Sequence, residues 1–116
     1  MSQQEKISII VLEPISESLQ TLLSNFGERE DIEIHRVSES ETAIKKIASA
    51  LPCMLIGSIE KSEQIPGMVN ILKRLEKLNQ SGQLKSLVCS KIKNQQLSKL
   101  ISGLGVTDYI EEPVPF

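Results

Sequence analysis

The chain has 116 residues and a mass of 12.9 kDa, which is the length of one domain built around one core. Its 13 basic and 15 acidic side chains give a net charge of -2, so the chain has no overall positive field that would hold nucleic acid or an anionic membrane. Only 3% of the residues are aromatic and there is no tryptophan, which excludes base-stacking platforms and aromatic cages and indicates an aliphatic core.

Residues with special chemistry are few. No apolar run approaches the roughly 20 residues that span a bilayer, and the first residues lack the pattern of a secretion signal, so we expect a cytoplasmic protein. Cys53 and Cys89 lie in short apolar runs, which indicates buried thiols and neither a metal site nor a disulfide scaffold. The single histidine, His35, has no second ligand candidate beside it, and we assign it no role.

The first part of the chain predicts two strands with a helix between them. Residues 7–12 form a nearly continuous β-branched apolar run, typical of a central strand covered on both faces. Residues 32–37 begin with strict alternation of apolar and polar side chains, which fits a strand at the edge of a sheet. Between them, Ser16 can cap a helix that Gly27 ends. The apolar face of this helix consists of Ile15, Leu19, Leu22, Leu23 and Phe26.

A second helix and a third strand follow. Ser38 and Glu41 form a capping box at the start of the helix. Residues 53–56, which come after Pro52, are apolar throughout and predict a central strand. A long polar loop is expected over residues 57–64. The buried stripe of the second helix is predicted to contain Ala43, Ile44, Ile47 and Ala48.

The remainder predicts two further helices and two further strands. The third helix begins at Pro66 and runs as one helix to the break at Ser81 and Gly82. Residues 86–89 predict the fourth strand, and residues 109–110 predict a short fifth strand. The fourth helix lies between these strands. Asn94 caps it, and its apolar stripe is Leu97, Leu100, Ile101 and Leu104, followed by Gly105 as the stop. The apolar face of the third helix is Met68, Ile71, Leu72, Leu75 and Leu78.

Strands and helices therefore alternate along the chain, with connections of helix length throughout. This order predicts parallel strands joined by right-handed crossovers. The edge character of residues 32–37 and the central character of residues 7–12 and 53–56 predict an α/β, flavodoxin-like five-stranded parallel sheet. The expected strand order is 2-1-3-4-5, with helices on both faces. Because ligands of such sheets bind beyond the carboxyl ends of the strands, the chemistry of this chain is expected there.

Four stretches of the chain resemble the receiver domains of bacterial two-component response regulators, and the resemblance covers essentially the whole length. They are residues 9–14, 52–58, 87–90 and 105–113. Residues 65–68 resemble the Met-Pro-Gly turn into the third helix but arrive several residues late. The resemblance implies a receiver-like fold. It also implies a site made of an acidic pair that holds Mg²⁺, a phosphoaccepting Asp, a hydroxyl residue and a Lys.

The positions of that site hold other residues in this chain. By the resemblance they are Glu13 and Pro14 for the acidic pair, Ser58 for the acceptor (Gly57 if the register slips), Ser90 for the hydroxyl and Glu112 for the Lys. A lone carboxylate holds a divalent cation weakly, and phosphoryl transfer loses its stabilising groups. We therefore predict a degenerate receiver, or pseudo-receiver, that is not an enzyme and has no catalytic residue, metal or cofactor.

The resulting interpretation is a non-catalytic signalling and protein-interaction module that acts through dimerisation or by docking to an output domain or partner. Two alternatives stay open. One is an atypical phosphoryl-accepting receiver that uses Ser58 or Ser90. The other is a small-ligand sensor at the carboxyl edge of the sheet, with the loop of residues 57–64 as a lid.

The expected partners are an output domain after Phe116 and a second copy of the chain. Residues 1–116 are predicted to form a single receiver-like domain, the N-terminal part of a longer regulatory protein, without the fifth helix that receivers have after the last strand. The resemblance implies an output domain after Phe116, such as a second-messenger-binding PilZ domain. Loss of the fifth helix uncovers apolar surface, which predicts a homodimer over that face or over the switch and interface candidates Leu104, Tyr109 and Ile110. We expect neither nucleic acid nor a membrane as partner.

Overall fold

The computed structural model describes residues 7–26 and 29–111, which form one five-stranded parallel sheet in the order β2-β1-β3-β4-β5. The predicted topology is confirmed. The strands are β1 (Ile7–Leu12), β2 (Ile32–Val37), β3 (Cys53–Ile59), β4 (Leu84–Ser90) and β5 (Asp108–Glu111). The helices are α1 (Glu17–Phe26), α2 (Ser40–Ala50), α3 (Ile65–Arg74), α4 (Glu76–Ser81) and α5 (Gln95–Gly103), with a 3-10 turn, η1 (Ser62–Gln64), before α3.

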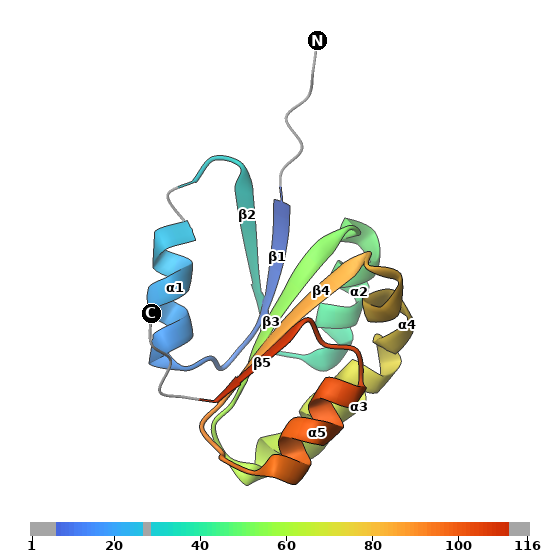
Figure 1. Cartoon of the computed structure of the whole chain (residues 1–116). Helices are drawn as coiled ribbons and strands as arrows, with labels where there is room; N and C mark the ends of the chain where they lie inside the picture. The colour runs from blue at the N-terminus through green and yellow to red at the C-terminus, as the bar shows by residue number, and fades with distance from the viewer. Residues whose placement is uncertain (1–6, 27–28, 112–116) are drawn as a thin grey trace.

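The sheet separates two cores of unequal size. Successive side chains of a strand point to opposite faces, so Leu55 and Val88 enter one core while Ile56 and Cys89 enter the other. Helices α2 to α5 pack on the first face, whereas α1 is the one helix of the described residues on the second (Figure 1). No helix among the described residues is long and apolar enough to cross a membrane.

Two predicted helix starts are confirmed by hydrogen bonds. Asn94 Oδ1 accepts the N–H groups of Gln96 and Leu97 at 2.8 and 3.2 Å. Ser16 Oγ accepts the N–H of Leu19 at 3.4 Å. Both side chains satisfy backbone donors that the first helical turn leaves without an intrahelical acceptor.

The capping box predicted at the start of α2 is wrong. The helix begins at Ser40, and Glu39 precedes it in an extended conformation without any side-chain cap. The carboxylate of Glu41 pairs instead with the guanidinium of Arg74 on α3. A bidentate pair of a guanidinium and a carboxylate is stronger than a hydrogen bond to one backbone N–H. The hydrogen bond from Arg74 also lowers the pKa of the Glu41 carboxyl.

Three further helix predictions need correction. The single helix expected from Pro66 is divided into α3 and α4 at Leu75, which has φ -101° and ψ 5°. The apolar spacing does not reveal this break because Leu75 stays buried and its N–H still donates to the carbonyls of Ile71 and Leu72. Ala48 and Leu100 were predicted in buried stripes but are exposed.

A cluster of buried polar side chains joins α4 to β4 on the face of the sheet that carries α2 to α5. Ser86 Oγ donates to Asn79 Oδ1 at 2.7 Å, and Asn79 Nδ2 donates to the carbonyl of Leu75 at 3.3 Å. The N–H of Ser86 donates to Thr107 Oγ1 at 3.1 Å. Ser86 and Asn79 are almost fully buried, so each group depends on its protein partner for a hydrogen bond.

We predict that Asn79→Ala lowers the free energy of unfolding by about 1–3 kcal/mol, because the buried Ser86 hydroxyl loses its acceptor. The matched control is Asn70→Ala on the exposed side of α3, which should change stability by less than about 0.5 kcal/mol. Urea unfolding of both variants measures the difference. Equal effects would show that the cluster contributes nothing to stability.

The two cysteines lie on opposite faces of the sheet. Cys53 begins β3 in the larger core, whereas Cys89 lies near the end of β4 in the core under α1. Cys89 pairs with Ser58, five residues beyond Cys53, which separates the two thiols by about 16 Å along the strands. Both are buried and neither is in a disulfide, as the sequence predicts.

We predict that both thiols react with a thiol reagent far more slowly in native buffer than in denaturant. Each is at most 6% exposed, and burial raises the pKa of the Cys53 thiol, which reduces the reactive thiolate. Absorbance of the released chromophore measures the rate. Rapid labelling of both cysteines in native buffer would contradict their placement in the two cores.

Candidate functional site

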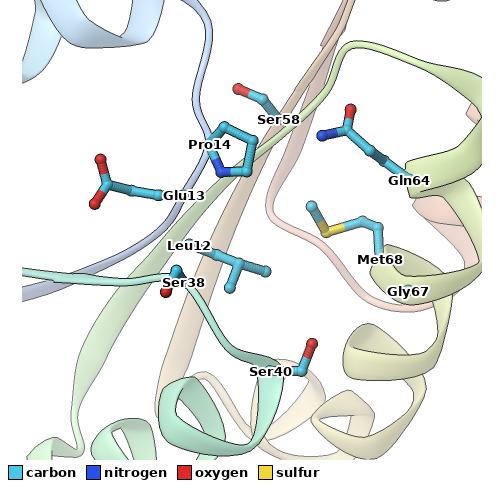
Figure 2. A pocket seen from close by; sticks show the side chains of 9 residues that line it. All are labelled: Leu12, Glu13, Pro14, Ser38, Ser40, Ser58, Gln64, Gly67 and Met68. Atoms are coloured by element: carbon cyan, nitrogen blue, oxygen red, sulfur yellow. The ribbon is translucent and has the colours of Figure 1, made fainter.

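The carboxyl ends of β1, β2 and β3 surround a small pocket with a volume of about 190 Å³. Figure 2 shows the nine residues that line it: Leu12, Glu13, Pro14, Ser38, Ser40, Ser58, Gln64, Gly67 and Met68. They come from the end of β1 and the loop after it, from the loop after β2, from the end of β3, from η1, and from the first turns of α2 and α3. The pocket therefore lies at the edge where a parallel sheet normally binds its ligands.

The one acidic side chain of this pocket is held by a basic neighbour. Glu13 follows β1, and its N–H donates to the carbonyl of Val37 at 2.7 Å. Its carboxylate accepts a hydrogen bond from Arg36 of β2 at 3.3 Å, and Arg36 also donates to Gln20 of α1 at 3.2 Å. The carboxylate points away from Ser58 and Gln64 (Figure 2). Glu13 thus serves the contact between β1, β2 and α1.

Ser58 lies within β3, two residues past the predicted end of the strand at Ile56. Its Oγ accepts the N–H of Ser16 at 3.0 Å, and the residue is only 4% exposed. The strand continues because Ile59 is fully buried and pairs with Ser90 of β4. The hydroxyl at the acceptor position therefore anchors the start of α1 to the end of β3.

Gly57 points to the opposite face from Ser58 and allows a close approach of α3. A Cβ at this position would lie 2.7 Å from Met68 Cε, which is closer than carbon atoms tolerate. The absence of a side chain lets Met68 pack directly on β3. Because glycine has neither a hydroxyl nor a carboxylate, the slipped register does not provide an acceptor either.

The prediction of a long loop over residues 57–64 is wrong. Gly57, Ser58 and Ile59 belong to β3, and η1 closes the remainder as a tight turn. Gln64 Oε1 accepts the N–H groups of Glu60 and Lys61 at 2.7 and 3.0 Å. With these bonds the segment is a short ordered connection that does not match the predicted lid.

Ser90, the second candidate hydroxyl, is the last residue of β4 and is fully buried. Its Oγ accepts the N–H of Ile92 at 3.0 Å and donates to the carbonyl of the same residue at 3.1 Å. Next to it, Lys91 pairs with Glu60 at 3.3 Å and its N–H donates to the carbonyl of Ile59 at 2.9 Å. These bonds link the loops after β3 and β4.

The three switch and interface candidates do not form one surface. Leu104 is 7% exposed and belongs to the larger core. Tyr109 packs against the same core, and its hydroxyl oxygen is buried with no hydrogen-bond partner among the described residues. Ile110 lies on the opposite face, against the core under α1. The alternation of β5 thus separates Tyr109 from Ile110.

Two further residues named in the sequence analysis are Glu112 and His35. Glu112 lies outside the described residues, and the neighbouring Glu111 is exposed at the end of β5. His35 is partly buried on β2 and pairs with Glu33 at 3.1 Å.

Solved structures with this arrangement of strands and helices include receiver domains of response regulators. The isolated REC domain of RcsB from Salmonella enterica serovar Typhimurium has a TM-score of 0.70 at 11% identity, over 96% of this chain and 80% of that chain. The fold is that of a receiver domain. No protein-family model matches the sequence, and no curated protein matches it.

Two proteins of pilus assembly share the receiver fold with this chain. A putative pilus assembly-related protein from Burkholderia pseudomallei has a TM-score of 0.67 at 17% identity, over 99% of this chain and 84% of that chain. The pilus assembly protein CpaE from Caulobacter crescentus has a TM-score of 0.61 at 14% identity, over 95% of this chain and 85% of that chain. At these identities the likeness concerns the fold.

The residues at the carboxyl edge do not fit the Mg²⁺ ion that the receiver fold implies. A divalent cation of this kind needs several oxygen ligands. Pro14 offers no side-chain oxygen at the second acidic position, and the Glu13 carboxylate is paired with Arg36. The described part of the chain contains no group of three or more His, Cys, Asp or Glu side chains that could hold a metal.

Sequence reasoning missed Arg36 and Gln64 at this edge, and it predicted Ser16 as a helix cap but not as the donor to Ser58. Ser16 and Arg36 form hydrogen bonds with residues that are distant in the sequence, and Gln64 forms its bonds within a turn whose shape the sequence does not predict. Only the ion pair of Arg36 could have been predicted from the sequence. A basic residue near the end of an edge strand lies beside the end of the neighbouring central strand, where Glu13 is. The register that pairs Arg36 with Val11 places it close to Glu13.

We predict that Ser58→Ala lowers the free energy of unfolding by about 1–3 kcal/mol, because the buried N–H of Ser16 loses this acceptor. Ser38→Ala is the matched control, since Ser38 lines the same pocket but is exposed. It should change stability by less than about 0.5 kcal/mol. Thermal and urea unfolding followed by circular dichroism measure both. A neutral Ser58→Ala variant would contradict the anchoring role.

Proposed function

We propose that this chain is a pseudo-receiver, a non-catalytic signalling module that acts by binding a protein partner or another copy of itself. The observation that carries the proposal is the state of Ser58. By the resemblance to receivers, Ser58 takes the position of the phosphoaccepting carboxylate, and its hydroxyl is buried and bonded to the backbone of Ser16. A group in that position cannot approach a phosphodonor while α1 keeps its place.

The phosphoryl-accepting alternative is disfavoured by the whole carboxyl edge. Phosphoryl transfer depends on positioned cations and hydrogen-bond donors that stabilise the charge of the transition state. Ser90 already exchanges two hydrogen bonds with Ile92, and Lys91 is paired with Glu60. Neither hydroxyl has a basic side chain bonded to it among the described hydrogen bonds, so neither is activated as a nucleophile.

The small-ligand alternative is disfavoured by the size of the pocket. Its volume of about 190 Å³ is below the range of about 300–1,000 Å³ that holds drug-sized ligands. The predicted lid is a tight turn held by Gln64. This favours a protein surface over a small molecule as the binding partner.

The proposed partners come from the resemblance to receiver domains. We propose that the module belongs to a longer regulatory protein and regulates an output domain after Phe116, for which a PilZ domain is one candidate class. The two neighbours named for pilus assembly make a role in building a surface appendage a reasonable context for that regulation. Nucleic acid and membranes stay outside the proposal because of the balanced charge.

We predict that incubation with acetyl phosphate and Mg²⁺ adds no phosphoryl mass to the protein. Beryllofluoride should leave the amide resonances of Ser58, Ser90 and Tyr109 unchanged, because the edge lacks an acceptor carboxylate and a metal site. Intact-protein mass spectrometry and two-dimensional NMR measure these outcomes. A receiver with a complete acidic site, treated in parallel, is the positive control.

The variant Ser58→Asp sharpens this test. It places a carboxylate at the acceptor position, yet Pro14 and the paired Glu13 still leave Mg²⁺ without ligands, so the variant should also stay unmodified. A stoichiometric adduct on the unmodified sequence would overturn the pseudo-receiver proposal. An adduct on Ser58→Asp alone would show that Ser58 is the single block to phosphorylation.

A further inference from the structure

Strand β2 lies at one edge of the sheet, and β1 is its neighbour among the described strands (Figure 1). The N–H of Ile7 donates to the carbonyl of Asp31 at 2.8 Å, and the N–H of Glu13 donates to the carbonyl of Val37 at 2.7 Å. Along a strand, the backbone groups of successive residues point to opposite sides within the sheet. The odd-numbered residues of β2 therefore bond to β1, and the even-numbered residues point their N–H and carbonyl groups away from it.

The outward backbone groups of β2 are unpaired in the part of the chain that the structure describes. No hydrogen bond between described residues includes the outward N–H or carbonyl groups of Ile34 and Arg36. Natural edge strands are usually protected from pairing by proline, lysine, a bulge or a very short length. Strand β2 pairs with β1 residue for residue over 6 residues and contains neither proline nor lysine. Its outer edge is therefore suited to pairing with another strand.

The charged side chains of β2 are already held on the two faces of the sheet. Arg36 bonds to Glu13 and Gln20 on the α1 face at 3.3 and 3.2 Å. On the other face, His35 pairs with Glu33 at 3.1 Å, and the Glu33 side chain is 50% exposed. These side chains lie above and below the strand, so the backbone groups at its outer edge are not used by them.

Geometry restricts how a second copy of β2 can pair with this edge. A two-fold axis perpendicular to the sheet places the two strands side by side and antiparallel. The bonds then join even-numbered residues of both copies, since only their groups point outward. Two registers meet this condition while using most of the strand, one centred on Ile34 and the other on His35.

The register centred on Ile34 is self-complementary. It sets Ile34 opposite Ile34 of the other copy, and it sets each Glu33 opposite His35 of the other copy. The register centred on His35 brings the two imidazoles together and leaves Glu33 opposite Val37. Glu33 and His35 occupy the pairs without backbone bonds, where opposed side chains are closest, and an acidic side chain opposite a basic one stabilises such a pair.

We infer that the outer edge of β2 binds β2 of a second copy of this chain, in the antiparallel register centred on Ile34. The inference rests on the proposed function and specifies its partner and its surface. The outward groups of Ile34 then bond to Ile34 of the other copy, and those of Arg36 bond to Ile32. Any extended strand could use these backbone groups, whereas the reciprocal contact of Glu33 with His35 favours a copy of the same strand.

Sedimentation velocity and light scattering of the 116-residue chain, from micromolar to near-millimolar protein, test this inference. We expect a dimer that dissociates on dilution. His35→Glu should raise the dimer dissociation constant by about tenfold or more, because two carboxylates then oppose each other at both symmetry-related contacts. The double variant Glu33→Lys with His35→Glu exchanges the two charges and should restore the dimer.

A matched control separates this edge from other surfaces. Gln96→Glu adds the same single negative charge at an exposed position of α5, which packs against β5 at the other edge of the sheet. This variant should leave the dissociation constant unchanged. Circular dichroism of each variant checks that the fold is kept.

Amide hydrogen exchange of the unmodified chain gives a reading that does not depend on any variant. The amides of Ile34 and Arg36 should exchange more slowly as the protein concentration rises, because the dimer supplies their acceptors. The amides of Asp108 and Ile110 are the control. They point outward at the β5 edge, since the N–H of Thr107 bonds to Ser86 of β4, and their exchange should not depend on concentration.

Three outcomes overturn the inference. They are a monomer at all concentrations, a dimer whose dissociation constant is unchanged by His35→Glu, and slowed exchange at Asp108 and Ile110 without any at Ile34 and Arg36. None of them alters the result with acetyl phosphate, so failure of this interface is distinguishable from failure of the pseudo-receiver proposal.

Discussion

Burial of both faces of the parallel sheet is the constraint on which the rest of this structure depends. Side chains of each strand alternate between two cores, so every strand residue is committed to one face by its position. This commitment sends Leu55 toward α2 and α3 and Ile56 toward α1. It also places Cys53 and Cys89 on opposite sides and divides Tyr109 from Ile110. The functional interpretation of β5 therefore follows from the alternation of its side chains.

At the carboxyl edge of this receiver-like fold, polar side chains bond to other parts of the protein. Three of these side chains are Ser58, which bonds to the start of α1, Glu13, which pairs with Arg36, and Ser90, which bonds to the loop that follows β4. Such bonds stabilise the connections between elements. The same bonds occupy the hydroxyl groups of Ser58 and Ser90 and the carboxylate of Glu13, on which the proposed function rests.

The order and direction of the strands could be predicted from the sequence because they depend on local patterns. The β-branched run of residues 7–12 and the alternation of residues 32–37 identified a central and an edge strand, and both assignments are confirmed with the same bounds. The end of β3 and the break at Leu75 were missed. An apolar pattern does not show where a strand stops pairing, nor where a helix tightens while its side chains stay buried. The sequence named candidate site positions, but it did not predict the hydrogen bonds and the ion pair that hold Ser58, Ser90 and Glu13.

What the sequence by itself determined is the alternation of strands and helices, the two caps at Ser16 and Asn94, and the absence of an acceptor carboxylate at residue 58. These are properties of neighbouring residues, and backbone periodicity and capping act within a few residues. Only the tertiary structure decided that Ser58 accepts the N–H of Ser16, 42 residues away, and that the side chain of Glu41 pairs with Arg74 of α3 and does not cap α2. The choice of a hydrogen-bond partner depends on which groups folding brings within about 3 Å of each other, and distance along the chain carries no information about that.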